Sequence, residues 1–380
     1  MATVAKPRQS IPASFYPLAV LTLVGVGLSV YRLAVGLGPT TNLSDHYPWG
    51  IWITVDLFLI PVAGAAFTIS LLSYFFGQAH CHAIVRGAVL AGLMGYGVAG
   101  ILLFLDIGRW HQIYNIFRLD IINPHSFLEE VSVCVALYTL ILVMEFAPVF
   151  LERWKDKPAI QPVLRFLDQS VFVVAGVGVV LSTLHQSSLG GLFLIMPYKL
   201  HPLWWTPALP IVFFLQALLA GLATTAIAVD LTLRGLKLSI DRRLYLHIGD
   251  ILRVILAIYL ALRVGDWFGS REIGLLFVPD RFSLLMWLEL VLGVFVPLGI
   301  LFTRLKAHIS GPFWAGAFVL IGILIDKLVV TWVGLAEPSP VTYFPSPIEI
   351  MITVGIAAGA FLLYGAVVRY LDVFPHNHHV

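Results

Sequence analysis

Residues 86–108 read RGAVLAGLMGYGVAGILLFLDIG, and no charged side chain falls between Arg86 and Asp106. The hydrocarbon core of a bilayer is roughly 30 Å thick, and an α-helix needs about 20 apolar residues to cross it. This stretch is therefore long and apolar enough to be a transmembrane helix. Similar stretches follow one another along the chain, and the sequence predicts spans at 14–36, 51–76, 86–108, 127–150, 166–187, 206–232, 247–267, 283–303, 313–334 and 347–370.

The composition agrees with a chain embedded in a membrane. Of the 380 residues, 59% are hydrophobic and 12% are charged, whereas an ordinary soluble domain carries about 25% charged residues. The connections between the predicted spans are too short to hold a soluble domain. We therefore predict an all-α integral membrane protein of about ten transmembrane helices, surrounded by the lipid bilayer. The small net charge of +2 gives no indication of nucleic-acid binding.

The distribution of Lys and Arg predicts which side each loop faces, because cytoplasmic loops carry an excess of these residues. With the N-terminus placed inside, fourteen of them fall on the inner side, five on the outer side and four within spans. Both termini are therefore predicted to be cytoplasmic. The connections at 37–50, 109–126, 188–205, 268–282 and 335–346 are predicted to face outward.

The sequence offers few ligands for a redox cofactor or a metal ion. It contains only Cys81 and Cys134, whereas an iron–sulfur cluster normally needs four thiolates. A transmembrane b haem usually needs two histidines that face each other within the helix bundle, and no histidine falls in the middle of a predicted span. We expect no iron–sulfur cluster, no haem and no metal site in this chain.

Several ionisable residues gather at one depth, near the outer ends of the second, third and fourth spans. Ionisable groups in lipid cost roughly 2.5–3.5 kcal/mol each by insertion scales, so they normally face the interior of a bundle. Asp106 and Arg109 are three residues apart, a spacing at which helical side chains can pair. With them come Asp56, His125 and Glu130. The group is either a structural cluster of salt bridges or a polar pocket for a small ligand.

A similar pattern returns in the seventh and eighth spans. Arg263 and Asp266 are again three residues apart, and Glu289 follows in the next span. The separation is 24 residues from Asp106 to Glu130 and 23 residues from Asp266 to Glu289. This repeat predicts two related four-helix bundles, at residues 1–158 and 159–307, followed by two additional helices at 308–380. The acids and the arginine of the second copy are candidates for proton transfer.

A third group of polar residues lies nearer the inner side. Glu145 follows Glu130 by fifteen residues, a descent of about 22 Å and a little over four helical turns. Both acids therefore lie roughly on one face, with Tyr138 between them, and Asp230 lies near the inner end of the sixth span. Acids spaced across a bilayer are what a proton relay needs.

A structural role for Glu145 is an equally open alternative. It lies close in sequence to Arg153 and Lys155, at the inner end of the fourth span. Glu145 is therefore also expected as an ion-pair partner of one of these bases, without any part in proton transfer.

At this point six short strings resemble those of a known family, the NrfD/polysulfide-reductase membrane subunits. The likeness runs over nearly the whole chain and is greatest to the ten-helix branch, the quinone-linking membrane subunits of hydrogenase-2-type uptake hydrogenases. Each string alone is weak evidence, and together they are specific. They are Tyr47-Pro48-Trp49-Gly50, Leu105-Asp106-Ile107-Gly108-Arg109, Met144-Glu145-Phe146-Ala147-Pro148, His185-Gln186-Ser187-Ser188, His201-Pro202-Leu203-Trp204 and Tyr343-Phe344-Pro345.

The resemblance implies a quinone-reactive subunit of the bacterial inner membrane, in two four-helix bundles with two further helices. It implies a quinone pocket near the outer face, with menaquinone as the expected quinone, and neither haem nor an iron–sulfur cluster in this chain. It also implies partners: a periplasmic ferredoxin-like iron–sulfur subunit and the large and small subunits of a Ni–Fe hydrogenase. Electrons would pass from hydrogen through the iron–sulfur subunit to quinone. Whether proton translocation accompanies this transfer stays open at this stage.

Within this hypothesis the outer group of residues takes named roles. A quinone needs hydrogen-bonding groups for its two carbonyl oxygens and protons for its reduction. Arg109 and His125 are predicted donors to the head group, and Glu130 and Asp106 are predicted proton donors or orienting groups. Asp56 is predicted to line the pocket, and Trp49 to form its wall (residues read from the sequence).

Two other functions stay open at this stage. One is the membrane subunit of a different quinone-linked complex of this family, such as a polysulfide or tetrathionate reductase or alternative complex III. The other is a secondary transporter, which also has many spans, a repeat and buried charges, although its site is expected at the midplane between broken helices. One departure from the hydrogenase relatives is Ala228, where they tend to carry a Glu and where Asp230 is the nearest acid.

Overall fold

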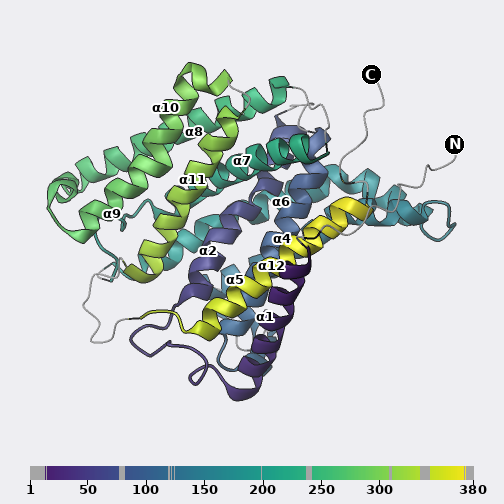
Figure 1. The fold of residues 1–380 in the computed structure, drawn as a ribbon, viewed down its shortest axis with the longest axis horizontal. Helices are drawn as coiled ribbons and strands as arrows, with labels where there is room; N and C mark the ends of the chain where they lie inside the picture. Colours follow the sequence, from purple (N-terminus) through teal and green to yellow (C-terminus); the bar gives the residue numbers. More distant parts are fainter. Residues whose placement is uncertain are drawn as a thin grey trace.

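The computed structural model describes residues 13, 15–76, 82–118, 120, 122–123, 125–197, 199–236, 242–307, 310–333, 343–371 and 373. Over these residues the chain is helical and contains no β-strand (Figure 1). The predicted all-α membrane fold is therefore confirmed. We call the end of the helical body that holds residues 36–50 and 107–118 the outer end, after the predicted orientation, and the end that holds residues 152–160 the inner end.

Within the described ranges, ten helical segments are long enough to cross a bilayer, and three of them contain a π-helical stretch. In chain order they are α1 (Phe15–Val35); α2 (Ile51–Ala63) with α3 (Ala65–Ser70) and η1 (Leu71–Phe75); α4 (His82–Asp106); α5 (Phe127–Leu151); α6 (Gln161–Leu194); α7 (Leu209–Leu236); α8 (Arg242–Gly269); α9 (Arg281–Leu290) with η6 (Val291–Phe295) and α10 (Val296–Phe302); α11 (Gly311–Leu328) with η8 (Val329–Val333); and α12 (Pro347–Tyr370). Short 3₁₀ segments are η3 (Trp110–Phe117), η4 (Glu152–Trp154), η5 (Ile273–Phe277) and η7 (Arg304–Ala307).

Nine of these segments, among the described residues, are also apolar enough to be membrane spans by composition. The exception is α8, which carries Asp250, Arg253, Arg263 and Asp266 within its length. It nevertheless packs between α7 and α10, side by side with apolar spans. Its charges therefore belong to the interior of the protein or to the two interfaces.

The helices form two four-helix bundles, but these are displaced by one helix from the predicted boundaries. The first bundle consists of α2 with α3 and η1, α4, α5 and α6, and the second of α7, α8, α9 with η6 and α10, and α11 with η8. The two meet where α7 packs on α2, α3 and α6. α1 lies along α12 instead of joining the first bundle (Figure 1).

Small residues explain this pairing of the first and last helices. Gly25 of α1 and Gly355 of α12 face each other so closely that a Cβ built on Gly25 would lie 2.7 Å from the Cα of Gly355. Such small-residue contacts let helix backbones approach closely in a membrane. Phe15, at the start of α1, lies beside Gly365 near the end of α12, so the two helices run antiparallel.

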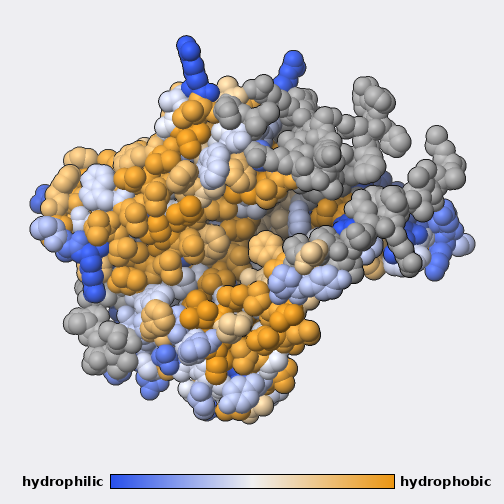
Figure 2. Space-filling model, in the orientation of Figure 1, coloured by the Kyte–Doolittle hydropathy of each residue, from blue (hydrophilic) through white to orange (hydrophobic). Residues whose placement is uncertain are grey.

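The flank of the helical body formed by α8 to α11 is apolar, as contact with lipid requires. Figure 2 shows hydrophobic side chains covering the flank formed by α8 to α11, with hydrophilic residues near the edges of the view. A soluble monomer rarely exposes an apolar patch of more than a few hundred Å². Exposed members of the flank include Val254, Ile258, Leu284, Trp314 and Ile321.

The contact between the two bundles yields a prediction about stability. A Cβ at Gly221 of α7 would lie 2.8 Å from the carbonyl oxygen of Gly64, at the break between α2 and α3. We expect Gly221→Val to destabilise the protein by about 1–3 kcal/mol through overpacking. The measurement is the thermal unfolding midpoint and the yield of folded protein in detergent.

Gly97 of α4 is the matched control, because a Cβ there would meet nothing within 4 Å. Gly97→Val should leave both the midpoint and the yield close to those of the unchanged protein. Equal stability of the two variants would contradict the close packing of α7 on the first bundle.

Candidate functional site

A buried cluster of charges lies at the outer end, where α1, α2 and α4 meet. Arg32 of α1 is fully buried, and its Nη2 donates a hydrogen bond to the carbonyl of Ile107 at 2.9 Å. Its guanidinium lies within electrostatic range of Asp106, as Asp106 does of Asp56 on α2. We call Arg32, Asp56 and Asp106 the outer cluster. Arg32 is not among the predicted site residues, because only the fold brings α1 beside the end of α4.

The outer cluster contains buried polar atoms that form no hydrogen bond within the described structure. Within the described structure, Nε and Nη1 of Arg32 and one carboxylate oxygen each of Asp56 and Asp106 have no hydrogen-bond partner. Buried polar atoms of folded proteins are normally paired with protein or with ordered water. The cluster is therefore suited to hold water or the polar head of a ligand.

Two of the predicted head-group donors lie elsewhere. Arg109 and His125 are both exposed at the outer end. The predicted pairing of Asp106 with Arg109 fails because α4 ends at Asp106, so the helical spacing of three residues does not apply. The chain beyond α4 is instead held against α1, since the Trp110 indole donates to the carbonyl of Leu33 at 3.1 Å.

Glu130 and Trp49 lie at the same end but beside α6. The Ser188 hydroxyl donates to Glu130 Oε1 at 2.6 Å. Trp49 packs edge-on against Phe193, with ring centroids 5.8 Å apart. The predicted convergence is thus partial: Asp56 and Asp106 come together with Arg32, whereas Glu130 and Trp49 border α6.

A second polar group, the central cluster, lies deeper in the first bundle and consists of Tyr96, Tyr138, Ser182 and His185. The ring centroid of Tyr96 lies 4.8 Å from that of Tyr138 and 5.7 Å from that of His185. His185 is completely buried, and neither of its ring nitrogens has a hydrogen-bond partner in the described structure. The hydroxyls of Tyr96, Tyr138 and Ser182 are likewise without a partner of normal geometry there.

The local sequence explains how α6 is placed to supply His185. The side chain of the next residue, Gln186, donates from Nε2 to the carbonyl of Ile60 at 3.1 Å. The same carbonyl also accepts from the N–H of Gly64 at 3.1 Å, at the junction of α2 and α3. Gln186 therefore anchors α6 near this junction, and the adjacent His185 is buried in the bundle. His185 is part of a motif shared with the family and is not among the predicted site residues.

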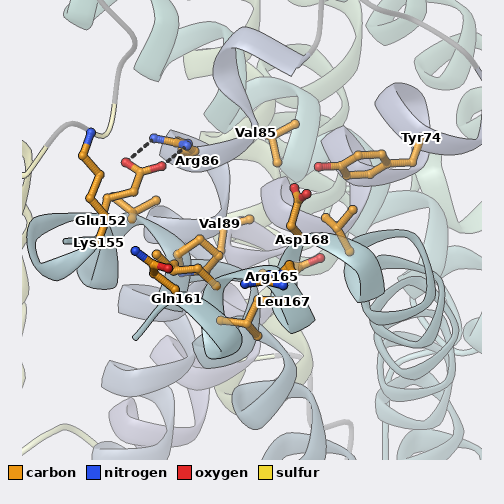
Figure 3. A pocket seen from close by; sticks show the side chains of 15 residues that line it. Tyr74, Val85, Arg86, Val89, Glu152, Lys155, Gln161, Arg165, Leu167 and Asp168 are labelled. Atoms are coloured by element: carbon orange, nitrogen blue, oxygen red, sulfur yellow. Dashed lines mark hydrogen bonds and ion pairs between the residues drawn. The ribbon is translucent and has the colours of Figure 1, made fainter. Parts of the chain in front are cut away.

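A pocket of about 620 Å³ opens at the inner end of the first bundle, between η1, α4, α5 and α6 (Figure 3). Figure 3 shows the ion pair of Arg86 and Glu152 on one side of the pocket, with Tyr74 and Asp168 on the other; the ion pair is 2.7 Å long. Glu145 also lines this pocket, and no ion pair joins it to Arg153 or Lys155 among the described residues. The predicted ion pair is therefore not formed among the described residues, and the role of Glu145 stays a prediction.

The three groups form a buried polar line through the first bundle. Asp56 lies within electrostatic range of Tyr96, which touches Tyr138. Tyr138 is in turn within range of Glu145, and Glu145 of Tyr74. Tyr138 and Glu145 are two turns apart on α5, about 10 Å at 1.5 Å per residue. Water has to bridge this gap if protons pass along the line, since a hydrogen bond spans only about 3 Å.

The predicted residues of the second bundle have a different arrangement. Arg263 and Asp266 do not pair with each other, because each binds the connection between α6 and α7. Glu289 binds the same connection, so all three side chains anchor it to the second bundle. The hydrogen bonds are Arg263 Nη2 to the Leu203 carbonyl at 2.8 Å, the Thr206 hydroxyl to Asp266 at 2.6 Å, and the Trp204 indole to Glu289 at 2.9 Å.

Asp230 also belongs to the second bundle. It is buried at the inner end of α7, and the hydroxyl of Tyr245 on α8 lies 3.5 Å from its Oδ1. Glu145 lies on α5, which packs mainly on α4 and α6, whereas Asp230 is near α8. Among the described residues, no hydrogen bond or ion pair joins Glu145 to Asp230.

Comparison with known proteins places the chain in a family. The family model described as "Polysulphide reductase, NrfD" matches residues 39–338. This chain belongs to the NrfD family. Membership and the apolar helices together make it a multi-pass protein of the bacterial inner membrane.

Two curated relatives cover almost the whole chain. The "Probable Ni/Fe-hydrogenase 2 b-type cytochrome subunit" of Escherichia coli is 30% identical, over 96% of this chain and 94% of its own length. The "Menaquinone reductase, integral membrane subunit" of Nitratidesulfovibrio vulgaris is 31% identical, over 94% of this chain and 91% of its own length. A more distant relative, from Halobacterium salinarum, is named for a dimethyl sulfoxide reductase and is 24% identical, over 94% of this chain and 90% of its own length.

The name of the first relative raises the question of a b haem. Among the described side chains, His185 is the one buried histidine, and it faces Tyr96 instead of a second imidazole. His46, His111, His125 and His247 are exposed, and His201 stacks on Phe282. A six-coordinate haem with two histidine ligands does not fit these residues, and no group of three or more His, Cys, Asp and Glu in this part of the chain is suited to a metal ion.

We therefore predict that the purified protein shows no haem absorption bands in reduced-minus-oxidised spectra. The physical reason is the lack of a facing histidine pair in the described bundles. A stoichiometric b-haem spectrum would contradict this expectation. In that case His185→Ala should abolish the spectrum and His125→Ala should not, since only the former side chain lies inside a bundle.

Proposed function

We propose that this protein is the quinone-reactive membrane subunit of a respiratory oxidoreductase. The observation that carries the proposal is the buried polar line of the first bundle, which runs from the outer cluster to the inner pocket. Relatives named as subunits of a menaquinone reductase and of a hydrogenase support it. Family membership favours this hypothesis over that of a secondary transporter.

The reaction sets what the protein has to supply. Reduction of a quinone to a quinol takes up two electrons and two protons. We place the head group at the outer end, within reach of Asp106 and Glu130, which would donate the protons. Arg32 would donate a hydrogen bond to a carbonyl oxygen of the quinone. Asp56 would reprotonate the two donors with protons that arrive from the central cluster. Trp49 would border the apolar side of the pocket.

The electrons would come from a partner at the outer end. We propose a ferredoxin-like iron–sulfur subunit on the periplasmic side, connected to the large and small subunits of a Ni–Fe hydrogenase, with menaquinone as acceptor. The hydrogenase assignment rests on the E. coli relative, and other relatives are named for other reductases. The exposed Arg109 and His125 lie where such a partner would cover them.

The protons would come from the inner side through the first bundle. Glu145 lies at the inner pocket and would take them up from water, and Tyr138, His185 and Tyr96 would lead them to Asp56. Uptake from the inner side, with electrons supplied from the outer side, moves charge across the membrane. The chain would then couple quinone reduction to a membrane potential.

Neutral variants of the two proposed proton donors test the quinone site. We expect Asp106→Asn and Glu130→Gln each to lower quinone reduction by the complex at least about tenfold, equivalent to 1.4 kcal/mol of barrier. Reduction of an artificial dye by the catalytic partner should persist, because it does not pass through this chain. Asp120→Asn is the control, since Asp120 is an exposed carboxylate at the same end, paired with Arg118.

The comparison separates a damaged site from a damaged complex. Loss of dye reduction together with quinone reduction would report failed assembly. If both variants reduce quinone as fast as the Asp120→Asn protein, the head group does not bind at the outer end of the first bundle.

Variants at the inner end test the proton route. In proteoliposomes, Glu145→Gln and Tyr138→Phe should lower the membrane potential generated per electron, because each removes an ionisable group from the line. Lys155→Gln is the control, since Lys155 lines the same pocket and lies outside the line. An unchanged potential per electron in both variants would mean that protons reach the quinone from elsewhere.

A further inference from the structure

The second bundle buries more charge than its contacts with the α6–α7 connection require. Arg263, Glu289, Asp326 and Lys327 are all at most 4% exposed. Arg263 and Glu289 bind that connection through Leu203 and Trp204, as described above. Asp326 and Lys327 of α11 have no such role, and ionisable groups inside a membrane protein mark a functional site by default.

The contacts of Lys327 link it to two neighbouring helices. Its Nζ lies 2.8 Å from Asp326 Oδ2 and donates to Gln216 Oε1 of α7 at 2.6 Å. It also lies over the ring of Phe213, 3.4 Å from the centroid. The amide of Gln216 reaches on to the hydroxyl of Tyr259 on α8, at 3.4 Å. The ion pair is therefore held in a network that spans three helices.

A small cavity lies beside this network. Its volume is about 20 Å³, and Gln216, Tyr259 and Glu289 supply its polar lining. One water molecule needs a cavity of at least about 10–15 Å³ and two to four polar partners, so the space is suited to a single water. Gly293 and Gly322 also line it, and their backbones approach so closely that a Cβ on Gly293 would lie 2.7 Å from the Cα of Gly322.

Both charged helices are wound irregularly next to the cavity. The π-helical segment η6 begins two residues after Glu289, and η8 begins two residues after Lys327. Short π-helical stretches within α-helices occur frequently at functional sites. The same arrangement on α9 and α11 indicates that these two side chains act together.

We propose that the second bundle contains a proton-loading site, in which Glu289 takes up and releases one proton through the water of this cavity. An O–H bond forms on the carboxylate as an O–H bond of that water breaks, and the water regains a proton from solvent. The net change is one proton taken up from solvent, and no electron is transferred. The Asp326–Lys327 pair and Arg263 stay charged and set the local field, while Tyr259 is the remaining titratable neighbour. The inference rests on the proposed function for the negative charge that drives loading.

Charge balance explains when the proton would be loaded. With Glu289 ionised, the two acids and two bases of the site sum to zero, and with Glu289 protonated the sum is +1. Charges interact strongly in a low-dielectric interior. Electrons arriving at quinone in the first bundle would therefore favour the protonated state, and neutralisation of the quinone by its own protons would release it.

The two bundles are in contact between the proposed quinone site and the Lys327 network. The hydroxyls of Thr54 on α2 and Thr331 on η8 are 2.8 Å apart, and Thr331 also donates to the carbonyl of Lys327 at 2.6 Å. Thr54 lies two residues before Asp56 of the outer cluster. A change of charge at the proposed quinone site thus lies close to the Lys327 network.

Infrared difference spectra of the purified complex, reconstituted with menaquinone and recorded during reduction after rapid mixing with dithionite, test the site. We expect a transient, quinone-dependent band of a protonated carboxylic acid, which disappears once the quinone is neutralised and which Glu289→Gln abolishes. Asp250→Asn is the control and should keep the band, because Asp250 forms its ion pairs with Arg253 and Lys306 near the inner end. Quinone reduction is measured on the same samples.

A second variant keeps the test decisive if Glu289→Gln fails to assemble. Trp204→Phe leaves the carboxyl in place and removes the indole that donates to Glu289 Oε2. The band should then persist and shift in frequency, since its carboxyl has lost a hydrogen bond. A band that neither variant alters, or the lack of any band in unchanged protein that reduces quinone, would overturn the inference. Failure of the unchanged protein to reduce quinone would instead overturn the proposed function.

Discussion

Hydrocarbon offers no solvation to an ionised side chain, so every charge on a membrane-spanning helix has to face another polar group inside the protein. Arg32, Asp56 and Lys327 all obey this constraint, and each lies where helices distant in sequence meet. This constraint determines which face of each helix points into the protein. An all-apolar helix surface would allow many rotations about the helix axis, whereas a buried charge permits only those that reach its partner.

The two bundles meet this constraint in different ways. In the first, the central cluster is built mainly from hydroxyls and an imidazole, and most of these atoms have no partner of normal geometry in the described structure. In the second, opposite charges lie together around Lys327, which forms an ion pair with Asp326 and donates a hydrogen bond to Gln216. The first arrangement suits hydration and proton transfer, because water can enter the gaps. The second suits a site whose field is held steady while one group titrates.

The two helices outside the bundles, α1 and α12, complete the surroundings of the buried charges. α1 and α12 pack on each other through Gly25 and Gly355, and they bring Arg32 to the end of α4 and Glu349 to the outer end. Glu349 accepts bonds from the Tyr343 hydroxyl and from the backbone of Ser346, which begins α12 in a reciprocal cap. α1 and α12 therefore cover the side of the first bundle on which Asp56 and Asp106 would otherwise face lipid.

Local pattern determined which segments are helices and that they lie in a membrane, because hydrophobic length and composition are properties of contiguous residues. It did not determine every length, since α6 runs from Gln161 to Leu194 where a span at 166–187 was predicted. The acids near the outer end were also visible, since a charge in an apolar run stands out. Their partners were not. The pairing of Asp106 with Arg109 failed because the helix stops between them, and Arg263 and Asp266 bind a connection some sixty residues away.

Only the tertiary structure decided the rest: that Arg32 serves the outer cluster, that His185 turns inward and that Asp230 belongs to the second bundle. Contacts between helices depend on rotation and on close approach at small residues, and neither is encoded within one span. Length and polarity are local, whereas partnership in a bilayer is a property of the packed bundle.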